Sequence, residues 1–189
     1  MNTHSLTGGF ENASHASANA FRVALDVMAR PGKIAEITGG TPPAPMSSAA
    51  GTLLLTLCDP ATPVWLAPSL SGSDIADWLR FHTGAPVVEN RHAAMFAVGA
   101  WAELLPISDF AIGTPEYPDR SATLIVEMET LEPSGAILRG PGIKSTAALG
   151  LPALTEFQNN AALFPLGLDF FLTAGSQIAA LPRTTKLEG

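Results

Sequence analysis

The sequence predicts a single α/β domain over residues 1–189, with a mixed β-sheet flanked by helices. In the first half of the chain, segments with apolar residues at helical spacing alternate with short apolar runs, a pattern typical of α/β folds. In the last third strand patterns dominate, and Ala174-Gly175-Ser176 separates two of them, which predicts an antiparallel side to the sheet. Residues 1–13 are expected to form a flexible N-terminus.

The first helix is expected over residues 14–30. Ser14 or Ser17 would cap its start, and the Pro-Gly pair at residues 31–32 would end it. The apolar side chains at helical spacing, which are expected to share one face, are Phe21, Leu25 and Met28.

Two further helices are expected. One covers residues 47–59 and ends where Asp59 precedes a proline; the other covers residues 71–84, with Ser71 or Ser73 as cap and Gly84 as the end. Residues 102–110 read as a helical turn, and residues 154–167 as irregular or partly helical. Strands are expected at 33–38, 62–67, 93–100, 121–131, 134–140, 168–175 and 177–184. The 134–140 segment should pair with 121–131 across the turn at 133–135.

The composition indicates a chain that meets other proteins. Hydrophobic residues make up 47% of the 189 residues and charged residues 14%, against roughly 25% charged in an average domain. So low a fraction of charged residues favours a surface that is partly covered by partner subunits, and it predicts a homodimer when the chain is isolated. The net charge of −7 argues against nucleic acid as a partner, because such proteins need an excess of cations.

Targeting and redox signals are few. The N-terminus lacks the basic start and apolar centre of a signal peptide, and prolines interrupt the longest uncharged run, at residues 37–58. We therefore expect a cytoplasmic protein without a membrane span. Cys58 is the only cysteine and lies in an apolar run, which predicts a buried, inert thiol. The four histidines lack the spacing of a metal site, and no metal is expected.

Cations gather in three stretches that each contain a proline or glycine. Six of the ten lysines and arginines lie in residues 30–33, 139–144 and 182–186. Together these stretches predict a local anion-binding site, although each alone is also typical of cations at helix ends and turn rims. The 139–144 stretch matches neither a Walker loop nor a GxGxxG fingerprint, and Pro141 removes a backbone donor from its middle. Loop chemistry alone favours a turn that leaves a strand.

Six stretches occur in an order that resembles the PhnH subunit family of the bacterial carbon–phosphorus lyase system. They are residues 21–32, 53–66, 79–86, 138–143, 163–173 and 180–185. The resemblance implies a partnership with the PhnG, PhnI and PhnJ subunits in phosphonate breakdown. That complex forms α-D-ribose 1-methylphosphonate 5-triphosphate from ATP and methylphosphonate and releases adenine. It also implies a fold like a reduced pyridoxal-phosphate-dependent transferase that has lost its cofactor, and a structural or accessory role without a cofactor.

The resemblance identifies no catalytic residue. The residues that match its motifs and that we expect to meet phosphate or a partner are Arg22, His82, Arg139, Gly140, Gly142, Arg183 and Thr184. A packing or turn role is the alternative for each of them. Two other functions remain open at this point: a stand-alone enzyme or binding protein for a phosphorylated small molecule, and a pyridoxal enzyme that uses one of the three lysines.

Overall fold

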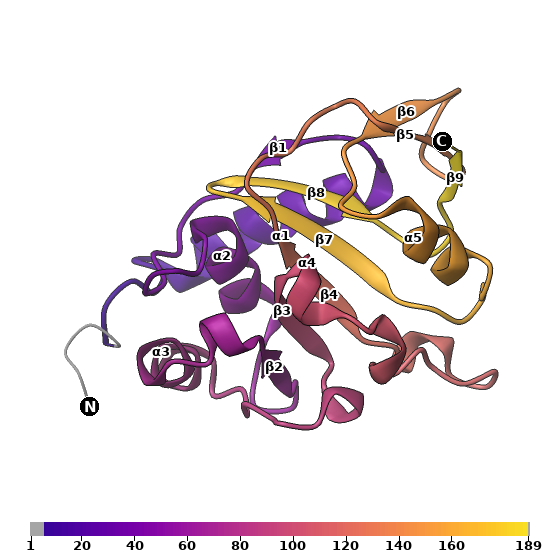
Figure 1. Ribbon diagram of the computed structural model, residues 1–189. Helices are drawn as coiled ribbons and strands as arrows, with labels where there is room; N and C mark the ends of the chain where they lie inside the picture. The colour runs from indigo at the N-terminus through magenta and orange to yellow at the C-terminus, as the bar shows by residue number, and fades with distance from the viewer. Residues whose placement is uncertain (1–5, 189) are drawn as a thin grey trace.

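The structure, a computed structural model, describes residues 6–188 with the exception of the Ser73 side chain. It is an α/β fold in which helices cover a mixed sheet, as the sequence predicts (Figure 1). Of the segment expected to be a flexible N-terminus, residues 1–5 lie outside the described part. The backbone carbonyl of Thr7 accepts a hydrogen bond from the indole nitrogen of Trp78 at 3.0 Å, so this segment packs on the protein by that point.

The predicted helices and strands occur in the predicted order, and two short strands at residues 147–149 and 186–188 were not predicted. The α-helices of the described residues are α1 (Ala13–Ala29), α2 (Ser48–Leu57), α3 (Ser73–Thr83), α4 (Trp101–Leu104) and α5 (Leu154–Ala161). The strands are β1 (Ala35–Glu36), β2 (Val64–Leu66), β3 (Phe96–Ala100), β4 (Thr123–Glu127), β5 (Ala136–Arg139), β6 (Ala147–Leu149), β7 (Asp169–Ala174), β8 (Gln177–Leu181) and β9 (Lys186–Glu188). The helical turn at residues 102–110 and the partly helical segment at 154–167 are confirmed as α4 and α5.

The main sheet has the strand order β1-β8-β7-β4-β3-β2. β2, β3, β4 and β7 run parallel, whereas β7 and β8 form an antiparallel hairpin and β1 pairs antiparallel with β8. The antiparallel side of the sheet therefore lies where the hairpin signal predicts it. Gly175 at the hairpin turn has φ +59°, in the left-handed region that glycine enters most readily.

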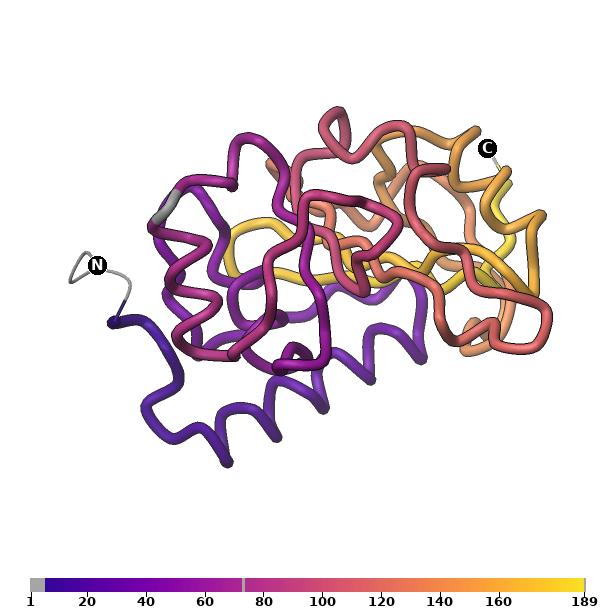
Figure 2. Tube along the Cα trace, turned by 90° about the horizontal axis from the view of Figure 1, so that it is seen from below, coloured from indigo at the N-terminus to yellow at the C-terminus, as the bar shows by residue number. Residues whose placement is uncertain are grey.

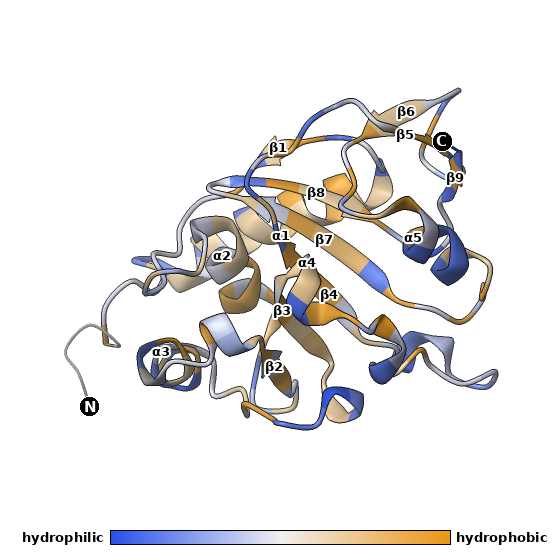
Figure 3. Ribbon diagram, in the orientation of Figure 1, coloured by the Kyte–Doolittle hydropathy of each residue, from blue (hydrophilic) through white to orange (hydrophobic). Residues whose placement is uncertain are grey.

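Apolar side chains of this sheet alternate between two cores. Ile125 of β4 and Phe171 of β7 are paired in register and face α1, α2 and α3. Their neighbours Leu124 and Phe170 face the opposite side, toward α5 and the second sheet. This period of two is what a strand buried on both faces requires. Figure 3 shows the strands of the main sheet as strongly hydrophobic, while α3 is more hydrophilic.

The pairing expected for the 134–140 segment is wrong. β5 lies in a separate three-stranded sheet of order β6-β5-β9, and the neighbour of β4 on that side is β7. The physical reason lies in burial: in β7 every residue after the first is buried, which suits a central strand covered on both faces. In β5 only Leu138 is buried while Ile137 is 36% exposed, which suits a small sheet with one wet face.

Two details of α1 differ from the prediction. Asn12 caps the helix in place of Ser14 or Ser17, and its side-chain oxygen accepts a hydrogen bond from the backbone N–H of His15 at 3.2 Å. The buried side chains of α1 are Ala20, Ala24 and Val27. The residues expected to form its apolar face do not line the core together, since Phe21 is 45% and Leu25 is 53% exposed. Small residues bury here because they let α1 approach α2 and β8 closely.

The start of α3 also differs from the prediction, and its end agrees with it. Gly72 occupies the N-cap position and makes no side-chain capping bond, while the hydroxyl of Ser71 donates to the carbonyl of Pro68 at 2.9 Å. Gly84 closes the helix with φ +73°, and its N–H donates to the carbonyl of Arg80. This left-handed C-terminal glycine is a common way to end a helix.

Candidate functional site

The three cationic stretches lie together at one end of the molecule. Gly142 touches the end of α1 so closely that a Cβ added there would lie 1.9 Å from the carbonyl oxygen of Ala29. A Cβ on Gly140 would lie 3.2 Å from the carbonyl oxygen of Thr184. Figure 2 shows α1 running along one side of the molecule, so that only its C-terminal end reaches these segments. The three cationic stretches are therefore close together in space, as a shared anion site would require.

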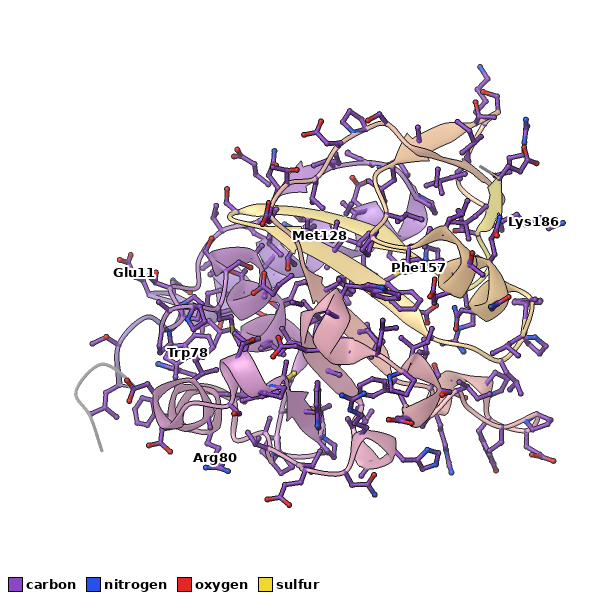
Figure 4. All side chains as sticks on the ribbon, in the orientation of Figure 1. Glu11, Trp78, Arg80, Met128, Phe157 and Lys186 are labelled. Atoms are coloured by element: carbon purple, nitrogen blue, oxygen red, sulfur yellow. The ribbon has the colours of Figure 1, made fainter. Side chains whose placement is uncertain are left out.

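Strand pairing places two cations side by side on this end. Arg139 of β5 is directly opposite Lys186 of β9, so their side chains leave the same face of the second sheet. The guanidinium Nε of Arg139 pairs with Glu188 at 3.2 Å, and its Nη1 donates to the carbonyl of Ser145 at 3.4 Å. Lys186 extends outward at the margin of the molecule (Figure 4).

The end of α1 contributes two more cations. The ammonium of Lys33 binds a carboxylate oxygen of Asp26 at 2.6 Å, and the Arg30 guanidinium pairs with the other oxygen of the same carboxylate. Neither Lys144 nor Lys186 forms an ion pair with another residue between positions 6 and 188. We call this surface the basic edge; it consists of Arg30, Lys33, Arg139, Lys144 and Lys186.

Arg183 lies close in sequence but points into the protein. Its backbone N–H and its Nε both donate to one carboxylate oxygen of Asp169, at 2.8 and 3.1 Å, and its Nη2 binds the other oxygen at 2.5 Å. Its Nη1 donates to the carbonyl of Pro118 at 2.7 Å, and its Nη2 also bonds the hydroxyl of Ser121. With only 12% of the side chain exposed, the guanidinium joins β7, β8 and the loop before β4.

Arg22 and His82 lie away from the basic edge. Arg22 is exposed on α1, about two turns before the end of the helix, and its Nη1 donates to the side-chain oxygen of Asn19 at 3.3 Å. His82 lies 3.3 Å from the carbonyl oxygen of Thr7. It also lines a groove of about 580 Å³ with Phe21 and other residues of α1 and α2. The structure therefore groups Arg139, Gly140, Gly142 and Thr184, and separates Arg22, His82 and the inward-facing Arg183 from them.

Sequence reasoning missed the polar groups at the carboxyl ends of the parallel strands, where open α/β sheets usually bind ligands. The carboxylate of Glu127, at the end of β4, accepts from the backbone N–H of Ser47 at 2.8 Å and from the hydroxyl of Thr173 at 3.0 Å. Two hydrogen bonds from Ser69 lower the pKa of Glu103. A carboxylate directly after a buried strand run was the available signal for Glu127. Its oxygens fix the start of α2 against the sheet.

The lone cysteine is unreactive in its surroundings. Burial raises the pKa of the Cys58 thiol to about 12, and this outweighs a hydrogen bond with Thr62 that lowers it. The thiol is therefore protonated at neutral pH and is a poor nucleophile. The three lysines that a pyridoxal cofactor would need as attachment points, Lys33, Lys144 and Lys186, are all exposed. Within residues 6–188, no helix is both long and apolar enough to cross a membrane.

Comparison with known proteins establishes the family. Residues 8–188 match the model of the family described as bacterial phosphonate metabolism protein (PhnH). The chain belongs to the PhnH family. A PhnH relative from Rhizobium meliloti (strain 1021), named alpha-D-ribose 1-methylphosphonate 5-triphosphate synthase subunit PhnH, is 46% identical over 190 residues, which cover 96% of this chain and 95% of the relative.

A second relative is more distant. The putative C-P lyase subunit protein HtxG from Stutzerimonas stutzeri is 29% identical over 174 residues, which cover 89% of this PhnH-family chain and 84% of HtxG. The family suggested by six ordered stretches of sequence is thus confirmed, and the match includes the whole basic edge.

Proposed function

We propose that this chain is a structural or accessory subunit of the complex that forms α-D-ribose 1-methylphosphonate 5-triphosphate from ATP and methylphosphonate and releases adenine. The observation that carries the proposal is the 46% identity with a subunit of that synthase over nearly the full length of both chains. The accessory role is supported by the side chains themselves. Arg183, a natural phosphate ligand by residue type, has its guanidinium engaged within the protein, and burial keeps the Cys58 thiol neutral.

The proposal extends to the origin of the fold. A mostly parallel sheet covered by helices is compatible with a reduced pyridoxal-phosphate-dependent transferase fold without the cofactor. All three lysines are exposed, whereas a lysine that holds such a cofactor needs an enclosed site. Superposition on a solved transferase of that class tests the likeness: a different strand order in the common sheet would contradict it.

We expect the tagged chain to retain PhnG, PhnI and PhnJ when all four are co-expressed, because the proposed role places it inside their complex. The measurement is affinity purification followed by size-exclusion chromatography and mass spectrometry. The assembled complex should convert ATP and methylphosphonate, and the isolated chain should show no turnover. Retention of none of the three subunits, or turnover by the chain alone, would overturn the proposal.

Without partners, the chain is expected to form a homodimer through the outer face of α1. Phe21 and Leu25 are 45% and 53% exposed there, and exposed apolar side chains that lie close together are typical of protein–protein interfaces. Leu25→Asp should shift the sedimentation-equilibrium mass toward the monomer. Met95→Asp is the control, since Met95 is 46% exposed but is not on α1. A monomeric wild type, or equal effects of the two variants, would contradict this prediction.

A further inference from the structure

The basic edge carries an excess of positive charge, whereas the rest of the molecule carries an excess of negative charge. Three of the five cations on the edge form ion pairs, and they share only two carboxylates, Asp26 and Glu188. The remainder of the sequence carries five cations and fifteen carboxylates. An excess of positive charge therefore collects at one end of a protein whose net charge is −7. Such a field attracts acidic surfaces and orients their approach.

The charges on this edge do not serve the stability of the chain alone. Arg139 and Lys186 are directly opposite each other on neighbouring strands, an arrangement that is unfavourable for like charges. The loop that follows Arg139, between β5 and β6, is nevertheless held in a fixed shape, because Gly140 and Gly142 have φ of +139° and +79° and pack against the backbone of Thr184 and Ala29. A repulsive pair on a well-fixed support is what a binding surface for negative charge requires.

The openness of the edge favours a protein over a small molecule. The side chains of Arg30, Lys33 and Arg139 are 61%, 46% and 50% exposed. Sites for small ligands are concave and enclose most of the ligand, usually with backbone N–H groups, and Pro141 removes one of these from the loop. Exposed charges on an open surface instead provide the orientation, specificity and fast association of protein complexes.

We propose that the basic edge docks this subunit onto an acidic surface of another subunit in its complex. The inference rests on the proposed function and adds to it the surface used and the chemistry of the partner surface. Lys144 and Lys186 are its uncommitted charges, since neither forms an ion pair within the described chain. They can therefore pair with partner carboxylates without breaking any bond in this chain.

The test is a charge reversal with a matched control. The Lys144→Glu/Lys186→Glu variant is compared with Arg80→Glu/Arg120→Glu, which changes the net charge equally. Arg120 is exposed in the segment before β4, where its guanidinium lies over the ring of Tyr117. Arg80 lies on α3, far from Lys186 (Figure 4). Binding of each purified variant to an immobilised assembly of PhnG, PhnI and PhnJ is measured at low and high salt. We expect the lysine variant to bind at least about tenfold more weakly at low salt, with a flatter salt dependence. The control should stay within about twofold of the wild type.

Further outcomes separate this inference from the proposed function. Unchanged affinity and salt dependence of the lysine variant, with a wild type that binds, would overturn the inference alone. A wild type that does not bind the assembly would overturn both. Calorimetry with ATP gives a third arm: if the lysine variant keeps its partner affinity but loses ATP binding, the edge is a nucleotide site and the inference fails. The milder Lys144→Gln/Lys186→Gln variant, checked by circular dichroism, should show an intermediate loss.

Discussion

Replacing Asp169 by alanine should lower the free energy of unfolding by about 3 kcal/mol, because it leaves a mostly buried guanidinium without its counter-ion. Asp169 and Arg183 are 24% and 12% exposed, and the carboxylate accepts bonds from the Arg183 backbone as well as from its side chain. The alanine variant would therefore lose both the ion pair and the anchor of the chain after β8. The loss should appear as a lower midpoint in urea-induced unfolding, followed by circular dichroism.

Two further variants make this prediction sharp. Arg80→Ala removes an exposed arginine whose pairing with Asp77 is long, at 3.8 Å, and should change stability by less than about 0.5 kcal/mol. Asp169→Asn keeps the shape and one acceptor but removes the charge, so it should fall between the wild type and the alanine variant. If Asp169→Ala cost no more than Arg80→Ala, the pair would contribute nothing to stability.

The same contact shows why sequence could place Arg183 among the candidates but could not orient it. Cations in a Pro-bounded stretch near a strand end predict a position at an edge of the fold. The direction of the side chain depends on Asp169, Ser121 and the carbonyl of Pro118, the last two more than 60 residues away in sequence. No spacing rule connects such distant groups, since only the order of strands in the sheet brings them together.

Prediction of the fold succeeded for features that the local sequence pattern determines. It failed for features that depend on which elements pack against each other. The strand pattern of β4 and the hairpin at Gly175 are local consequences of sequence. The partner of β5 is not, because consecutive strands usually pair but here the more deeply buried β7 takes the place beside β4. The prediction of the buried face of α1 was wrong for a related reason. We expected its large apolar residues to face the core, but the close packing of α1 buries the small residues Ala20 and Ala24.

The convergence of the three cationic stretches is intermediate between these cases. Their glycines and prolines mark turns, and turns at the ends of neighbouring elements meet at one edge, so the sequence predicted a shared anion site without showing contact. The structure adds the contact between the 139–144 loop and the end of α1, at Gly142 and the carbonyl of Ala29. Stability of the loop and orientation of the basic edge therefore depend on the same glycine.

Gly142→Ala should accordingly destabilise the protein by about 3 kcal/mol. A φ of +79° costs a residue with a side chain about 1–2 kcal/mol, and the new methyl group would collide with the Ala29 carbonyl at 1.9 Å, which forces a backbone shift of comparable cost. Gly175→Ala separates the two terms, because Gly175 also has a positive φ, +59°, but a Cβ there meets nothing within 4 Å. It should cost only about 1 kcal/mol.

The difference between these two variants in urea-induced unfolding measures the contact between the loop and the end of α1. A shift of that contact would also move Arg139 relative to Arg30, so Gly142→Ala should weaken binding to the PhnG, PhnI and PhnJ assembly under conditions where the variant is still folded. Gly175→Ala, in the β7–β8 turn, should leave that affinity unchanged. Equal stability losses for the two variants would mean that the loop around Gly142 moves away from the Ala29 carbonyl at no cost in stability. The glycine would then shape a turn without holding the basic edge against α1.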